Sequence, residues 1–258
     1  IARSNTAIAS SLRFKNESDS PRRYAIATTP SFGEPAFYKG LALAQLNRHK
    51  EAIKAFEYVL GLIEDHASAY YHLGLSLAAL GRYEKAITAF SHALSCDPAL
   101  NDAAYHTGIA YANLGKYKDA LAAFDHVLGQ VPAHAPLLYN KGRALAKLSR
   151  FEESLQALDE ALTLENNDAL VWNLQGSVRL ELGMFSQSLE SFDHAIALDP
   201  DNSPAWYLKG KALFELGRMN EALPCFEKVI GLDPSCAMAW LRKGAAHSHL
   251  GDYASAIE

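Results

Sequence analysis

Residues 203–234 read SPAWYLKGKALFELGRMNEALPCFEKVIGLDP. Large and small apolar residues recur in this stretch at spacings of three and four, which indicates helices and not strands. Gly217 fits the left-handed position that follows the last turn of a helix. Pro234 disfavours helical geometry in the residue before it, so a second helix ends there. The stretch therefore predicts a hairpin of two helices.

The same pattern recurs along the chain with a period of 34 residues. A glycine inside a helix costs about 1 kcal/mol relative to alanine, so a recurring one requires a packing reason, and close approach of two helices supplies it. The glycines that keep this period are Gly40, Gly74, Gly108, Gly142, Gly176, Gly210 and Gly244. Sixteen residues after each of the first six comes a bulky apolar residue: Phe56, Phe90, Phe124, Leu158, Phe192 and Phe226.

The turn inside each hairpin is also periodic. Glycine at the left-handed position is expected at Gly81, Gly115, Gly183, Gly217 and Gly251, with Asn47 and Ser149 replacing it in two units. One hairpin of this length cannot bury enough surface to fold alone. Stacking covers the apolar stripe of each hairpin with its neighbour, so the chain is expected to form a solenoid.

These units resemble tetratricopeptide repeats. The unit that begins at Ser203 fits best, with matching residues Trp206, Gly210, Gly217, Ala222, Phe226 and Pro234. Departures are mild, such as Glu64 and Asn166 in place of the final proline. The resemblance implies an all-α fold, a right-handed superhelical solenoid of antiparallel helix hairpins. It covers residues 33–258, with six full repeats from 33, 67, 101, 135, 169 and 203 and a truncated seventh from 237, while residues 1–32 form a non-repeat N-terminal extension.

The resemblance also implies that the first helix of each hairpin lines a concave groove that binds peptides. Positions three before and one after the periodic glycine are then expected to face the groove. We predict as binding residues Phe37, Leu41, Tyr71, Leu75, Tyr105, Ile109, Tyr139, Arg143, Tyr207 and Lys211. Tyrosine offers a large contact area and a hydroxyl. The alternative, that these tyrosines only pack against adjacent helices, stays open.

The groove residues predict a ligand with an apolar part and some acidic character. Arg143, Lys147 and Lys211 supply positive charge, diluted by Glu181 and Glu215. The lysine, asparagine and arginine set by which some family members hold chaperone tails is not matched. The asparagine ladder of the sugar-transferase members is not matched either.

No set of residues in the sequence predicts a catalytic or metal-binding site. His72 and His106 occupy equivalent positions in adjacent units, but no carboxylate or cysteine joins them, so we expect polar groove residues and not a metal site. A nucleophile with a base and an orienting group cannot be assembled from the sequence. We therefore expect a protein that is not an enzyme and that uses no cofactor and no metal.

Composition narrows the class of partner. A formal net charge of −5 argues against nucleic acid as the main partner. Apolar runs are too short for membrane insertion. The three cysteines are scattered, which favours a reducing compartment and hence a cytoplasmic location.

These features together predict a protein-protein interaction scaffold. Two alternatives remain: a targeting or regulatory arm of a larger enzyme truncated after residue 258, and a self-assembling structural scaffold. Residues 1–32 are interpreted as a polar tail or cap, and self-association through this segment is the alternative. A solenoid normally closes with a polar capping helix, so we expect the uncapped C-terminal end either to continue in a longer chain or to associate with another chain.

Overall fold

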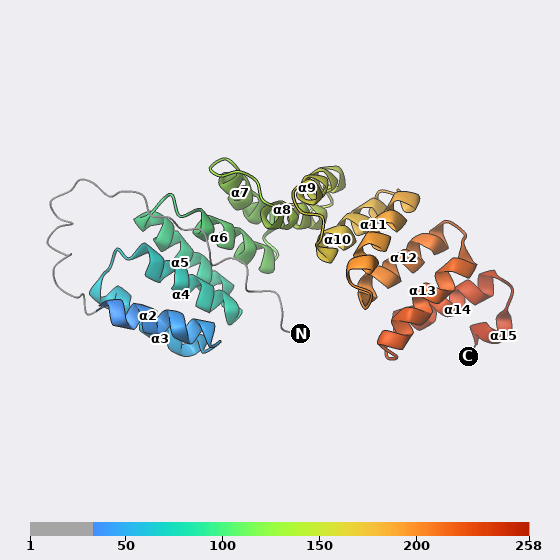
Figure 1. Cartoon of the computed structure of the whole chain (residues 1–258), viewed down its shortest axis with the longest axis horizontal. Helices are drawn as coiled ribbons and strands as arrows, with labels where there is room; N and C mark the ends of the chain where they lie inside the picture. Colours follow the sequence, from blue (N-terminus) through green and yellow to red (C-terminus); the bar gives the residue numbers. More distant parts are fainter. Residues whose placement is uncertain (1–32, 258) are drawn as a thin grey trace.

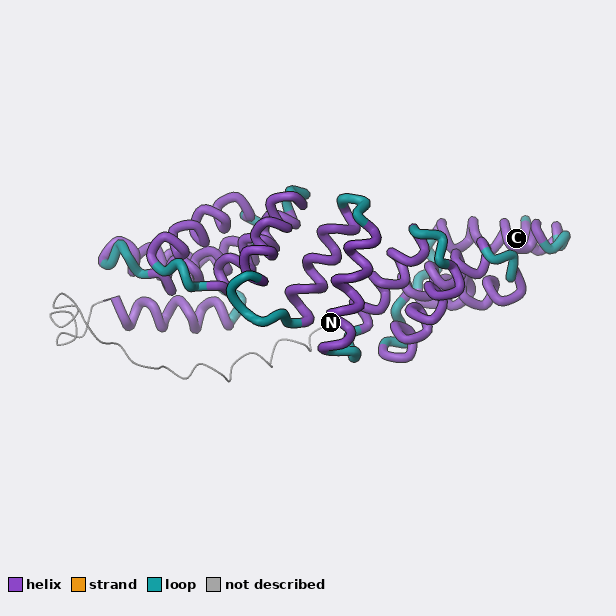
Figure 2. The backbone as a smooth tube through the Cα atoms, turned by 90° about the horizontal axis from the view of Figure 1, so that it is seen from above, coloured by secondary structure: helices purple, strands orange, loops and turns teal. Residues whose placement is uncertain are grey.

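The computed structural model describes residues 33–257, and all regular structure between them is helical (Figures 1 and 2). The first helices of the hairpins, called A helices below, are α2 (Gly33–Gln45), α4 (Ala67–Ala79), α6 (Asn101–Asn113), α8 (Ala135–Lys147), α10 (Ala169–Glu181), α12 (Ser203–Glu215) and α14 (Ala237–His249). The second helices, called B helices, are α3 (His49–Leu62), α5 (Tyr83–Cys96), α7 (Tyr117–Leu128), α9 (Phe151–Leu164), α11 (Phe185–Leu198), α13 (Met219–Leu232) and α15 (Tyr253–Ala256). The all-α fold of consecutive hairpins is confirmed. The N-terminal extension predicted for residues 1–32 lies outside the described residues.

The periodic glycines allow the two helices of a hairpin to approach closely. A Cβ atom added at Gly74 would lie 2.4 Å from Cε1 of Phe90, and one at Gly108 would lie 2.5 Å from Cε1 of Phe124. Both phenylalanine side chains are fully buried. Glycine is therefore required because the phenylalanine ring of the B helix lies directly on the backbone of the A helix.

The turn between the two helices has left-handed backbone geometry in every hairpin of the described range. Glycine has this geometry in five of the turns, and Asn47 and Ser149 adopt it with φ of 57° and 58°. The Arg48 amide donates to the Leu43 carbonyl at 2.8 Å, which satisfies a carbonyl at the end of α2. The predicted left-handed positions are confirmed.

The A helices form the inner side of the solenoid. Each A helix lies against the next one along the chain, from α2 and α4 to α12 and α14, whereas within residues 33–257 successive B helices do not approach one another. A curved row of hairpins must bring the helices on its inner side closer together than those on its outer side. The surface of the A helices that faces this inner side is called the inner face below; Figure 1 shows the curved row.

The connection between α7 and α8 differs from the others. Helix α7 ends at Leu128 and α8 begins at Ala135, so residues 129–134 connect them, whereas residues 97–100 suffice between α5 and α6. Gly129 and Pro132 lie in this longer segment, which Figure 2 shows as an extended loop. The third and fourth hairpins are therefore joined by a loop that is two residues longer than the loops that join the hairpins on either side of them.

Candidate functional site

The ten predicted binding residues lie on α2, α4, α6, α8 and α12, and each is partly exposed. The rings of Phe37 and Tyr71 contact the buried phenylalanines of their own hairpins, with centroids 5.9 Å from Phe56 and 6.0 Å from Phe90. Tyr105 lies in the same way against Phe124 at 6.1 Å. These rings therefore combine the two roles considered from the sequence: one side contacts the core and the remainder stays accessible.

Histidines join these aromatic residues into a continuous row across the first repeats. The Phe37 ring lies 5.8 Å from that of His72, and the Tyr71 ring lies 5.8 Å from that of His106. Each imidazole also stacks on a buried phenylalanine, His72 on Phe56 at 5.9 Å. Between residues 33 and 257 no group of three or more histidine, cysteine, aspartate or glutamate side chains is arranged to hold a metal ion.

Two further histidines, which the sequence analysis did not select, reach the same row. His66 stacks on Phe37 at 5.0 Å, and His134 lies 5.8 Å from Tyr105. Both occupy the last position of a repeat, directly before an A helix, where Asp168 and Asn202 stand in later repeats. Because aspartate and asparagine are typical helix N-caps, comparison at this position could have identified the histidines as caps.

A polar cluster follows the aromatic row on α6 and α8. Asn140 donates from Nδ2 to the Tyr105 hydroxyl at 3.0 Å and to the Pro136 carbonyl at 2.8 Å. The guanidinium carbon of Arg143 lies 5.8 Å from the centroid of the Tyr139 ring. These residues, Tyr105, Tyr139, Asn140 and Arg143, are called the Arg143 cluster below.

The electrostatics of the cluster reflect its partial burial. Burial raises the pKa of Tyr105 and of Tyr139, and the nearby Arg143 guanidinium opposes the rise in both. Asp168 acts in the other direction on Tyr139. Arg143 forms no ion pair with any residue of the described range, whereas Lys211 approaches Glu181 at 3.9 Å. The guanidinium therefore retains hydrogen-bond donors that no carboxylate between residues 33 and 257 occupies.

The structure does not bring all ten residues into one contiguous set. Tyr207 and Lys211 lie on α12, and Asn173 of α10 occupies the inner-face position between Tyr139 and Tyr207. The Asn173 Oδ1 atom is buried and has no hydrogen-bond partner among the described residues. The predicted residues therefore divide into an aromatic and polar stretch from α2 to α8 and a separate pair on α12.

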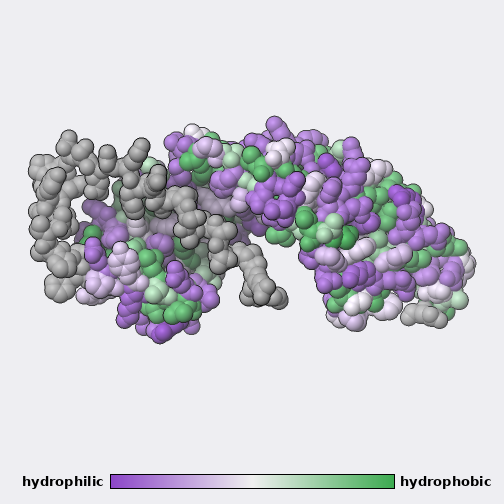
Figure 3. Space-filling model, in the orientation of Figure 1, coloured by the Kyte–Doolittle hydropathy of each residue, from purple (hydrophilic) through white to green (hydrophobic). Residues whose placement is uncertain are grey.

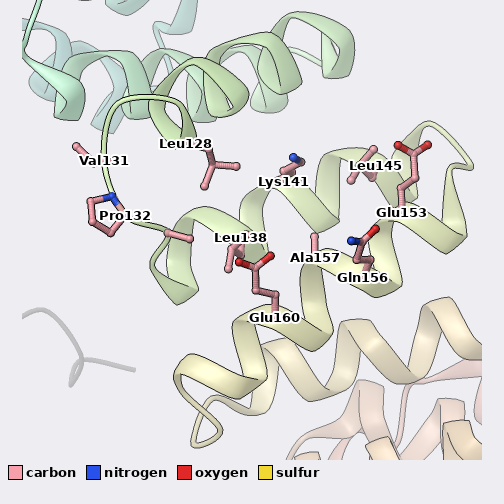
Figure 4. Close-up of a pocket in the computed structure, with 11 residues that line it drawn as sticks. Leu128, Val131, Pro132, Leu138, Lys141, Leu145, Glu153, Gln156, Ala157 and Glu160 are labelled. Atoms are coloured by element: carbon pink, nitrogen blue, oxygen red, sulfur yellow. The ribbon is translucent and has the colours of Figure 1, made fainter.

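None of the ten residues lines any of three hollows that lie among residues 33–257. The hollow in Figure 4, of about 380 Å³, lies between the 129–134 loop, α8 and α9, and Glu153 and Glu160 border it. Two others, of about 430 and 400 Å³, are lined by residues of α2 and α3 and of α9 to α11. Figure 3 shows hydrophobic residues in small patches among hydrophilic ones on the face it presents. These three hollows therefore lie apart from the predicted binding residues.

Comparison with known families identifies the repeat. Models described as tetratricopeptide repeat match residues 37–101 with 220–258, residues 112–178, residues 169–202 and residues 203–236. The chain belongs to the tetratricopeptide repeat family. A search of curated protein sequences found no match. No catalytic family is among the matching models.

Several solved structures share this architecture. YrrB, described as a TPR protein with an unusual peptide-binding site, is 25% identical, with coverage of 72% of this chain and 96% of YrrB and a TM-score of 0.62. MamA from Desulfovibrio magneticus RS-1 is 26% identical, covering 66% of this chain and 97% of that one, with a TM-score of 0.63. PilF of Pseudomonas aeruginosa is 23% identical, and the match covers 74% of this chain and 87% of the PilF chain. Its TM-score of 0.65 shows that the two proteins share a fold. No helix within residues 33–257 combines the length and apolarity needed to cross a membrane.

Proposed function

We propose that the protein is an interaction scaffold whose inner face binds a peptide segment or an exposed segment of a partner protein. The observation that carries this proposal is the row of partly exposed aromatic rings from α2 to α8, continued by the Arg143 guanidinium, which pairs with no carboxylate of residues 33–257. YrrB, at 25% identity, is described as having a peptide-binding site, which supports the same use of this fold.

The chemistry of the inner face changes along the array, and this change defines the ligand. Phe37, Leu41, Tyr71, Leu75 and Ile109 supply an apolar surface on the first three A helices. Apolar side chains of a ligand gain free energy there by leaving water, and aromatic rings are frequent anchors in such interfaces.

The Arg143 cluster supplies the polar end of this surface. The Tyr105 hydroxyl accepts a hydrogen bond from Asn140, so its own proton remains available to a ligand acceptor. Arg143 adds a planar set of donors suited to a carboxylate. The ligand therefore carries an acidic residue beside its apolar segment, and the acidic residue lies at α6 and α8.

The proposal is tested by selecting peptides from a random library on the intact protein and measuring their affinity calorimetrically. We expect ligands that combine apolar residues with aspartate or glutamate. Changing Arg143→Gln should weaken these ligands about tenfold, the value of one charge-assisted hydrogen bond, and should reduce the dependence of affinity on salt. Arg150→Gln alters the same charge on an exposed residue paired with Glu153 and should leave affinity unchanged.

A second set of variants tests the aromatic row. Tyr71→Ala, Tyr105→Ala and Tyr139→Ala together should abolish binding, whereas Tyr58→Ala, at an exposed position on α3, should not. Circular dichroism establishes that the triple variant stays helical. Ligands that bind the folded triple variant as tightly as the original chain would show that the inner face is not the binding surface.

A further inference from the structure

Two of the helix caps along the inner face are imidazole rings. The Nδ1 atom of His66 accepts a hydrogen bond from the Ala69 amide at 3.2 Å at the start of α4. The Nδ1 atom of His134 accepts one from the Leu137 amide at 3.3 Å at the start of α8. The equivalent cap on α12 is the side-chain oxygen of Asn202, which accepts from the Ala205 amide at 3.1 Å.

Only a neutral histidine can form such a cap. Protonation at Nδ1 replaces the acceptor with a second donor, so the amide of the first helical turn loses its partner. It also places a positive charge beside the positive end of the helix dipole, which destabilises the helix further. An asparagine cap does not titrate and keeps its hydrogen bond as the pH changes.

The surroundings of His66 favour the neutral ring. Phe37 of α2 stacks on it, and His72 of α4 is the titratable group that faces it. His72 itself lies between Phe37 and Phe56 of α3. Within the described part of the chain, no carboxylate acts on His66 or His72 to stabilise a cation.

The surroundings of His134 contain one carboxylate and one phenol. Tyr105 of α6 lies at 5.8 Å, and the Asp102 charge at the start of α6 favours the protonated form of both His134 and His106. Burial has the larger effect in both cases. His106 is enclosed by Phe90 of α5 and by Tyr71 and Tyr105.

The sign of the pH effect follows from these shifts. Burial lowers the pKa of His66, His72, His106 and His134 in the folded chain. The unfolded chain therefore binds protons at these sites from about pH 6.5 downward, while the folded chain does not yet bind them. Stability conferred by the neutral rings is complete above that pH and is lost as the pH falls toward the folded-state pKa values.

We infer that the first half of the solenoid is a proton-sensitive element, in which acidification removes the histidine caps of α4 and α8 and loosens both helices. Helix α4 carries Tyr71 and Leu75, and α8 carries Tyr139 and Arg143, so loosening them also releases the ligand of the inner face. That second consequence rests on the proposed function, whereas the loss of the caps does not.

The caps can be followed in the unliganded protein by nuclear magnetic resonance. We expect the amide resonances of Ala69 and Leu137 to move as the pH is lowered from about 7.5 to about 5, with the same midpoints as the His66 and His134 imidazole nitrogens. The Ala205 amide serves as the internal control and should not follow these midpoints. Imidazoles that protonate while both amides stay in place would overturn the inference.

A matched variant isolates the caps from the other histidines. The double substitution His66→Asn with His134→Asn introduces the residue already present at position 202. Acidification should increase the local opening equilibrium of α4 about tenfold in the original chain, the combined effect of a lost cap and an unfavourable helix-end charge. In the double variant this increase should fall to the part that His72 and His106 contribute, and persistence of the full increase would contradict the inference.

Tryptophan fluorescence separates the two halves of the chain. Trp172, Trp206 and Trp240, the three tryptophans, lie on α10, α12 and α14, so their emission reports the second half. Urea unfolding followed by resonances of α4 should shift to lower urea at acidic pH by more than unfolding followed by tryptophan emission. Because no ligand is present, this result is independent of whether peptides bind the inner face; equal shifts in the two halves would overturn the inference.

Discussion

Replacing one periodic glycine tests the packing on which the solenoid depends. At Gly74 an added Cβ atom would lie 2.4, 2.6 and 2.9 Å from three carbons of the Phe90 ring. Carbon atoms in contact are normally separated by about 3.5–4.0 Å, so the nearest pair overlaps by about 1 Å or more. Phe90 is fully buried and cannot move away without displacing its neighbours.

The expected cost follows from two opposing effects. Overpacking a close-packed core costs about 1–3 kcal/mol, and an overlap of this size belongs at the upper end of that range. Alanine recovers about 1 kcal/mol of helix propensity relative to glycine. Gly74→Ala should therefore destabilise the chain by about 2 kcal/mol. Complete loss of the Phe90 packing sets a ceiling of about 4 kcal/mol, since truncating a buried phenylalanine costs about 3–5 kcal/mol.

Gly61→Ala is the matched control in the same half of the chain. Gly61 lies in α3 and a Cβ atom there would meet nothing within 4 Å, so this change should stabilise the chain by up to about 1 kcal/mol. Both variants are compared by urea denaturation followed by circular dichroism. A Gly74→Ala chain as stable as the Gly61→Ala chain would refute the packing argument. So would a cost that persists when Phe90→Ala removes the ring.

Three further changes test other features. Ser149 has φ of 58°, so Ser149→Gly should stabilise the chain by about 1 kcal/mol in urea denaturation, with Gly115→Ser showing the opposite sign. Gln175, 3% exposed, donates to Asp159 at 2.6 Å and accepts from Ser191 at 2.7 Å; Gln175→Leu should cost about 1–3 kcal/mol, measured by tryptophan fluorescence. Burial raises the pKa of Tyr71, Tyr105 and Tyr139, so these phenols keep their protons above about pH 10 while the unfolded chain loses them, and stability should fall as the pH rises further. Absorbance titration that shows every tyrosine ionising together near pH 10 would contradict this.

The periodic features of the fold could be predicted from the sequence because each has a local cause. A glycine equivalent to Gly210 is present in every full repeat. A phenylalanine equivalent to Phe226 is present in all of them except the fourth, where Leu158 replaces it. A glycine in one helix and a large ring at the matching position of the next helix indicate that the two helices are in contact. Asn47 and Ser149 were also predictable, because the turn requires left-handed geometry whichever residue occupies it.

The candidate site could be predicted only in part, because its chemistry depends on contacts between repeats. The Asn140 bond to Tyr105 joins residues 35 positions apart, and no pattern within one repeat reveals it. Lys141 and Lys209 pair with Asp125 and Asp193, each sixteen positions earlier. Arg143 has the same charge as these two lysines in the sequence, and only the structure shows that, unlike them, it pairs with no carboxylate of the described residues.

The repeat separates the residues that hold the fold from those that we propose to bind a ligand. The buried positions are nearly the same in each hairpin, so the hairpins stack on one another in a similar way along the chain. The inner-face positions, in contrast, change from Phe37 and Tyr71 at one end to Arg143 and Asn173 farther along. A ligand that matches this order must span α2 to α8 in one direction, because reversing it would place its acidic residue against the aromatic row. Burying a carboxylate there without a partner costs more than the apolar contacts of one side chain return. On the proposed function, the inner face therefore selects the direction of a bound segment as well as its composition, and a peptide with the reversed sequence should bind more weakly than the original.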